Sequence, residues 1–265
     1  MLRKWQKGMR RPCRSDMLRE ALVFGPIHSR RLGSSLGINL LPTNGKLCNF
    51  DCVYCECGLN ADGRSDRRLP TARELRTELD AYLQRCRAEN VHIDSITFSG
   101  DGEPTLNPEF ADIVDVTLSL RDRWYPHSKV SVLTNATRIS RPEIFAALRR
   151  VDNPILKLDA VTAEMASAVN APQCEYDIDR QIADMKRFEG DFIMQTMLLK
   201  GPGFDSADMI GRWKEVVREL RPREVQLYTI SRPVPVRGLV KYTAGQMRSM
   251  VQDLIDEGHI INIYE

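Results

Sequence analysis

The chain has 265 residues and a net charge of +2, and its 42% hydrophobic and 28% charged residues suit a single α/β domain with a sizeable core. No apolar run approaches the roughly 20 residues of a membrane-spanning helix, and the N-terminus lacks a signal-peptide core, so we expect a cytoplasmic protein with no membrane segment. The seven cysteines are an odd number with three of them clustered, which favours reduced thiols over a disulfide framework.

Positive charge is concentrated near the N-terminus. Residues 1–31 hold nine Lys and Arg residues against Asp16 and Glu20, a net charge of +7. A basic arm can bind a phosphate backbone, but a solvated tail has the same composition. We predict a flexible basic extension over residues 1–20, with Met17 as an alternative start, and a folded domain over residues 21–265.

The folded part opens with a segment punctuated by glycine and proline. Residues 22–24 are a predicted short strand, and Gly25-Pro26 is a predicted turn. The adjacent Arg30 and Arg31 suit recognition of a carboxylate or a phosphate, but solvated charges on a surface hairpin would have the same pattern. Residues 37–41 are the first predicted strand of the main sheet.

Three cysteines follow this strand closely. Cys48, Cys52 and Cys55 have the spacing C-x3-C-x2-C. Three thiolates can hold one face of a [4Fe–4S] cluster and leave one iron without a protein ligand, and an open metal position is where chemistry can occur. Structural zinc is the alternative, but no second Cys pair or Cys/His pair follows. Cys57 follows Cys55 too closely to reach the same cluster.

Helical and strand patterns alternate along the rest of the chain, which is typical of parallel βα units. Three helix starts have a capping-box pattern, namely Thr71-Ala-Arg-Glu, Ser140-Arg-Pro-Glu and Thr243-Ala-Gly-Gln. The predicted helices are residues 71–88, 108–120, 140–150, 163–169, 177–188, 206–220 and 243–257, and the predicted strands are residues 93–99, 130–135, 155–160, 192–199, 225–230 and 259–264.

Polar residues and glycines lie at the ends of successive strands, where functional groups gather in parallel α/β barrels. The segment Gly100-Asp-Gly-Glu-Pro104 ends one strand, and Asn135 ends the next. Leucines and charged residues alternate along residues 155–160. If the leucines face the surrounding helices, Lys157 and Asp159 lie on the opposite face, inside the barrel. Lys157 can bind an anionic group there or pair with Asp159.

The cysteine loop, with Tyr54 directly before the third cysteine, resembles the signature of the radical S-adenosyl-L-methionine (radical SAM) superfamily. Gly100-Asp-Gly-Glu-Pro104 resembles that family's Gly-Gly-Glu-Pro motif. The resemblance implies a partial (βα)6 barrel of parallel strands with outer helices over residues 21–265, including the C-terminal helix and strand. It also implies a [4Fe–4S] cluster held by Cys48, Cys52 and Cys55, and SAM bound by Tyr54, Gly100, Gly102, Glu103, Asn135 and Asp159.

Within that set, Glu103 would supply the charge for the SAM ammonium and the glycines would let backbone carbonyls approach it. Tyr54 would contact the adenine, and Asn135 and Asp159 are candidates for the carboxylate and ribose contacts. Asp159 is as readily interpreted as a strand-end cap.

The resemblance further implies an oxidoreductase-type reaction. An electron from a flavodoxin- or ferredoxin-type reductant would cleave SAM to methionine and a 5′-deoxyadenosyl radical, which abstracts hydrogen from a substrate. Three segments look like a bacterial group related to wyosine-forming tRNA enzymes, namely residues 24–33, residues 157–160 with Asn170 downstream, and residues 226–229 with Arg232-Pro233. We therefore predict tRNA or nucleoside modification, with modification of a protein or peptide as the alternative. A non-catalytic Fe–S or zinc module is a third hypothesis, but it has no use for the Gly100–Glu103 segment.

Overall fold

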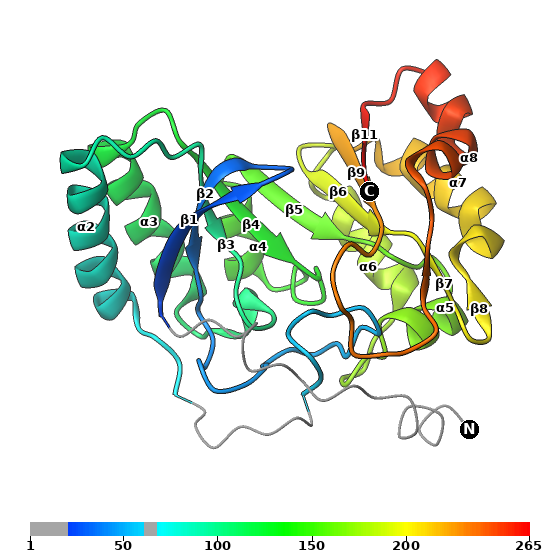
Figure 1. Cartoon of the computed structure of the whole chain (residues 1–265), viewed down its shortest axis with the longest axis horizontal. Coiled ribbons are helices and arrows are strands. Elements are labelled where there is room, and N and C mark those ends of the chain that lie inside the picture. The colour runs from blue at the N-terminus through cyan, green and yellow to red at the C-terminus, as the bar shows by residue number, and fades with distance from the viewer. Residues whose placement is uncertain (1–20, 61–67) are drawn as a thin grey trace.

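An eight-stranded sheet organises the fold (Figure 1). The computed structural model describes residues 21–60 and 68–265, so the predicted basic extension lies outside the described residues. The first strand of the sheet is antiparallel to the second, and every later neighbouring pair is parallel. In spatial order the strands are β1 (Val23–Ser29), β2 (Gly33–Ile38), β3 (Ser95–Phe98), β4 (Lys129–Thr134), β5 (Asn153–Lys157), β6 (Ile193–Met197), β9 (Glu224–Tyr228) and β11 (Ile261–Tyr264).

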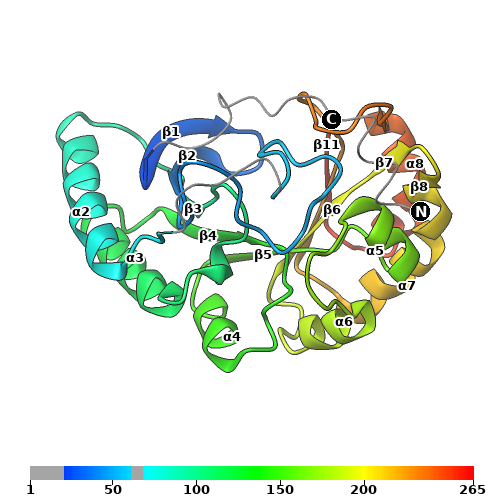
Figure 2. The same ribbon diagram turned by 90° about the horizontal axis from the view of Figure 1, so that it is seen from below.

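The sheet is curled with helices along its outer side, and the chain that follows β2 crosses in front of it (Figure 2). The predicted partial barrel of parallel strands with outer helices is thereby confirmed. None of the helices that the structure describes has the length and apolar character needed to cross a membrane. The helices are α2 (Ala72–Ala88), α3 (Phe110–Trp124), α4 (Pro142–Leu148), α5 (Ala163–Val169), α6 (Ile178–Lys186), α7 (Ile210–Leu220) and α8 (Ala244–Asp256), with 3-10 turns η2 (Pro104–Leu106) and η3 (Ser206–Met209).

Two of the three predicted capping boxes are present. The Thr71 hydroxyl accepts from the Glu74 amide at 3.2 Å and the Glu74 carboxylate accepts from the Thr71 amide at 2.9 Å, and α8 begins in the same way. The box predicted at Ser140 is wrong. Proline favours the first helical position, so Pro142 places the N-cap on Arg141, and α4 starts with no side-chain cap.

The β1–β2 hairpin corrects the prediction of a turn at Gly25-Pro26. Gly25-Pro26 lies within β1 rather than in a turn, at an irregularity where the pairing with β2 shifts between Phe24 and Ile27. A bulge accommodates a proline, which cannot donate a ladder hydrogen bond. The turn comes after Ser29, so Arg30 and Arg31 are indeed on a hairpin.

A second, three-stranded sheet was not predicted. It contains β7 (Leu199–Gly201), β8 (Phe204–Asp205) and β10 (Val240–Lys241), in the order β10-β7-β8. The predicted strand over residues 192–199 is in fact β6 followed by the start of β7. Strands of two or three residues are too short to produce a recognisable alternation in sequence.

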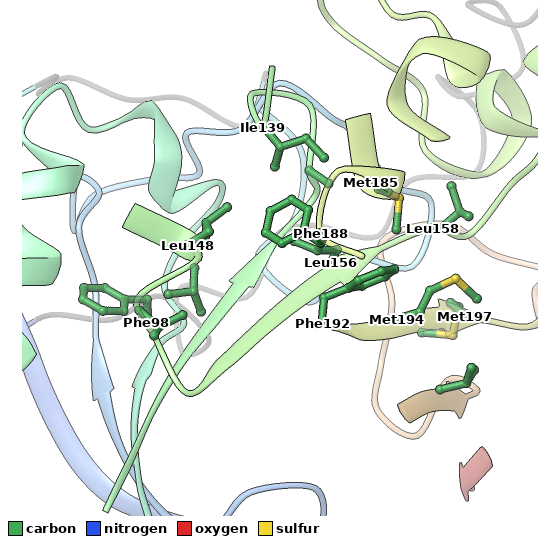
Figure 3. Close-up of a cluster of buried hydrophobic side chains, with 14 of the residues drawn as sticks. Phe98, Ile139, Leu148, Leu156, Leu158, Met185, Phe188, Phe192, Met194 and Met197 are labelled. Atoms are coloured by element: carbon green, nitrogen blue, oxygen red, sulfur yellow. The ribbon is translucent and has the colours of Figure 1, made fainter. Parts of the chain in front are cut away.

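Strand β5 separates the hydrophobic core from the barrel interior. Leu156 and Leu158 are buried and lie with Met185 and Phe188 (Figure 3). Lys157, between the two leucines, donates to the Tyr228 hydroxyl at the end of β9 instead. The alternation along β5 thus puts apolar side chains toward the helices and a charged one toward the interior.

Candidate active site

The cysteine loop is stabilised by N–H groups that point at its sulfur atoms. The Cys48 Sγ accepts from the Phe50 amide at 3.4 Å and lies 3.6 Å from the Asn135 Nδ2. The Cys52 Sγ accepts from the Asn170 Nδ2 at 3.4 Å. Donors around sulfur favour the thiolate, which is the form that ligates a metal. Burial acts in the opposite direction and raises the pKa of the Cys48 and Cys52 thiols.

Lys46 is a buried cation beneath the loop that sequence reasoning missed. It is 3% exposed, and its Nζ donates to the Asp51 Oδ1 at 3.3 Å and to the Gly58 carbonyl at 3.2 Å. Burial alone would lower the pKa of Lys46, but the three clustered thiols, Cys55 foremost, and Asp51 together raise it well above its ordinary value. The feature of the sequence that could have identified Lys46 is its position, two residues before the first cysteine of the loop.

Cys57 lies beside Cys55. A hydrogen bond from the Cys57 thiol lowers the pKa of Cys55 and raises that of Cys57. The Cys57 Sγ is also 3.8 Å from the Gly100 carbonyl oxygen. Its exclusion from the ligand set stays a prediction.

The cysteine loop is joined to the Gly100–Glu103 segment through the backbone. The Leu47 amide donates to the Asp101 carbonyl at 2.8 Å, and the Glu103 amide donates to the Leu47 carbonyl at 3.0 Å. A Cβ on Gly102, whose φ is +144°, would lie 1.8 Å from the Leu47 carbonyl oxygen. Gly102 therefore has a structural role beyond the predicted one, because only glycine allows the two motifs to approach this closely.

Glu103 joins the ends of β3 and β4. The carboxylate is 2% exposed, and its Oε1 accepts from the Thr105 amide at 3.1 Å, the Thr105 hydroxyl at 2.6 Å and the Thr134 hydroxyl at 2.7 Å. Its Oε2 accepts from the Asn135 amide at 2.7 Å. Burial raises the pKa of Glu103, while these hydrogen bonds oppose the rise. Because Oε2 accepts one hydrogen bond from the described residues, it retains a lone pair for a ligand.

Asp159 lies between β5, the cysteine loop and β6. Its carboxylate accepts from the Tyr54 hydroxyl, from the Asn170 Nδ2 at 2.7 Å and from the Met197 amide at 2.9 Å. The Lys157 Nζ is 3.5 Å from its Oδ1, so the predicted Lys157–Asp159 pair forms. Asp159 also caps the Met197 amide, as the strand-end interpretation expected.

Asn170 contacts both Cys52 and Asp159, and no local sequence pattern indicated that contact.

The predicted site residues come together at one end of the curled sheet. Asn135 donates to the Asn49 Oδ1 of the cysteine loop at 2.6 Å, which adds a contact between β4 and that loop. A cavity of about 370 Å³ begins at Tyr54 and Cys55 and extends to Tyr228 and the β1–β2 hairpin. The cavity therefore lies beside Cys55, and the loop that carries Cys55 is joined through its backbone to the segment that ends in the buried Glu103.

Comparisons with known proteins identify the family to which this chain belongs. Residues 45–213 match the Radical SAM superfamily. The UPF0026 protein of Methanocaldococcus jannaschii is 31% identical over 217 residues, which are 80% of this chain and 64% of that protein. The chain thus spans less than two thirds of that relative.

Two solved structures show the same fold at low identity. Streptococcus suis SuiB bound to S-adenosylmethionine has a TM-score of 0.62 at 16% identity, covering 86% of this chain and 50% of SuiB. TYW1 with a lysine–pyruvate adduct bound has a TM-score of 0.61 at 12% identity, covering 86% of this chain and 76% of TYW1. The narrower resemblance to wyosine-forming enzymes remains a prediction. Since the superfamily match takes in the cysteine loop, the Gly100–Glu103 segment and β3 to β6, this chain belongs to the radical SAM superfamily of enzymes.

Proposed function

We propose that the protein binds one [4Fe–4S] cluster through Cys48, Cys52 and Cys55, binds SAM beside it, and modifies a tRNA or a nucleoside. The observation that carries the proposal is the backbone pairing of the cysteine loop with the segment that ends in Glu103. This pairing puts a three-thiol set and a buried carboxylate side by side. When bound, a reduced cluster supplies the electron that cleaves SAM to methionine and a 5′-deoxyadenosyl radical, the species that abstracts hydrogen from the substrate.

The donor chemistry of the loop suits an anionic cluster. Amide donors at Cys48 and Cys52 and the buried Lys46 offset the negative charge of thiolate ligands. We assign Glu103 to the SAM ammonium, Gly100 and Gly102 to the close approach of backbone carbonyls, and Tyr54, Asn135 and Asp159 to the remaining SAM contacts. A flavodoxin- or ferredoxin-type protein would be the reductant.

The test of this function is anaerobic reconstitution of the full chain with iron and sulfide, followed by addition of SAM and dithionite. We expect 5′-deoxyadenosine to form, and to form faster when bulk tRNA is added. Faster formation with peptides and not with tRNA would favour the protein-modifying alternative. A reconstituted protein that forms no 5′-deoxyadenosine under any of these conditions would contradict the proposal.

Replacing Glu103 by glutamine is expected to weaken SAM binding without loss of the cluster. The amide keeps the size of the side chain but removes the charge that would meet the ammonium, which should cost about 1.5–3 kcal/mol, or roughly tenfold to a hundredfold in affinity. Titration calorimetry of the reconstituted protein measures this. Glu143→Gln, an exposed change on α4, is the matched control. Equal SAM affinity in both variants would remove Glu103 from the site.

Binding of labelled tRNA is expected to weaken steeply as salt is added. Contacts between basic side chains and phosphates release counterions, which makes affinity depend on salt concentration. The measurement compares the full chain with a version that starts at Met17. We expect the salt dependence to survive truncation, because hydrogen abstraction needs a target oriented by the folded domain. Equally weak binding by both versions with no salt dependence would exclude a nucleic-acid substrate.

A further inference from the structure

The β1–β2 hairpin turn reaches across the open side of the curled sheet to the ends of β9 and β11. Its first arginine, Arg30, makes the closing contact, because its guanidinium donates to the Glu265 main-chain oxygen and to the Ser231 hydroxyl at 2.9 Å. The hairpin turn therefore forms one wall of the cavity that begins at the cysteine loop.

The guanidinium of the neighbouring residue, Arg31, contacts an aromatic ring, whereas that of Arg30 donates to oxygen atoms. The Arg31 guanidinium carbon lies 4.8 Å from the centre of the Tyr228 ring, and the side chain lines the cavity. Across the described part of the chain no carboxylate pairs with Arg31. Arg232, another arginine of the cavity lining, is paired with Glu56 at 2.9 Å.

The Tyr228 side chain is in turn held by Lys157. The Lys157 Nζ donates to its hydroxyl and lies 4.8 Å from the ring centre. Two cationic groups therefore share one aromatic ring, and Asp159, 3.5 Å from Lys157, already accepts three further hydrogen bonds. Arg31 therefore adds to this wall a positive charge with no carboxylate partner among the described residues, and an arginine that stacks on an aromatic ring has its planar donors pre-organised for an anion.

We infer that Arg31, stacked on Tyr228, anchors an anionic group of the substrate, a phosphate or a carboxylate, in the cavity of the proposed active site. The inference rests on the proposed function, and it distinguishes two arginines that are indistinguishable in sequence. Arg31 binds substrate, whereas Arg30 closes the barrel wall. The guanidinium fork offers two parallel N–H donors to either kind of anion.

The experiment titrates inorganic phosphate, and separately acetate, into the full-chain reconstituted protein labelled with ¹⁵N-arginine. We expect saturable binding of one anion that shifts the Arg31 side-chain resonance. Arg31→Gln should weaken that binding roughly tenfold to a hundredfold, since it removes a charge-assisted contact. Arg30→Gln, the matched control, should leave it within about twofold. Saturation by phosphate assigns a phosphate-bearing substrate, and saturation by acetate assigns a carboxylate.

Arg31→Lys keeps the charge and is the second variant if Arg31→Gln does not fold. It should bind the anion more weakly than the wild type, because a lysine has no planar fork. The inference is overturned if neither anion saturates the wild type, or if the two Gln variants bind alike, or if Arg31→Lys binds like the wild type. SAM titration of the same samples separates the proposals. Anion binding without SAM binding would contradict the proposed function and leave the subsite standing.

Discussion

Alanine substitution of Cys48, Cys52 or Cys55, one at a time, is expected to abolish the brown iron–sulfur absorbance of the reconstituted protein. Each change removes one of three protein ligands, and a cluster held by two thiolates has lost a third of its protein attachment. Cys57→Ala is the matched control, and we expect it to retain the cluster. Its thiol is turned toward Cys55 and the Gly100 carbonyl, so its loss removes a hydrogen bond rather than a ligand.

Iron and sulfide content and the absorbance spectrum measure this outcome. Cys86→Ala is a further control, because Cys86 is buried on α2, away from the loop. Loss of the cluster in Cys57→Ala with retention in Cys48→Ala would show that the ligand set is misassigned.

Gly102→Ala is expected to disconnect the cysteine loop from the segment that precedes Glu103. The added Cβ would lie 1.8 Å from the Leu47 carbonyl oxygen, and the φ of +144° is strained for any other residue. Relief requires a backbone shift that breaks the Leu47 amide contact at 2.8 Å and the Glu103 amide contact at 3.0 Å. We expect a loss of about 2–4 kcal/mol in the free energy of unfolding and low iron content after reconstitution.

Gly211→Ala is the control for this change. Gly211 lies in α7 with nothing within 4 Å of an added Cβ, so alanine there should be neutral or stabilise by about 0.5–1 kcal/mol. Urea unfolding and iron analysis of both variants make the comparison. Full iron content and unchanged stability in Gly102→Ala would mean that the loop does not pack against Gly102.

Features that depend on residues close in the chain were predictable from sequence. The helix over residues 163–169 has the predicted bounds, and the Thr71–Glu74 and Thr243–Gln246 capping boxes form, because each depends on residues three apart. The cysteine spacing and the glycine-rich strand end predicted the superfamily for the same reason. Where two local signals competed, as at Ser140 and Pro142, the stronger backbone constraint of proline prevailed.

Features that depend on the curl of the sheet could not be read from the chain. The Asn170–Cys52 contact joins residues 118 apart, and the Arg30–Glu265 contact joins residues 235 apart. The burial of Lys46 and the different surroundings of Arg30 and Arg31 likewise follow from how the loop and the hairpin meet distant strands. Local patterns specify which elements form, whereas pairing across the sheet decides which side chains meet, because the hydrophobic periodicity of a strand does not encode its neighbours.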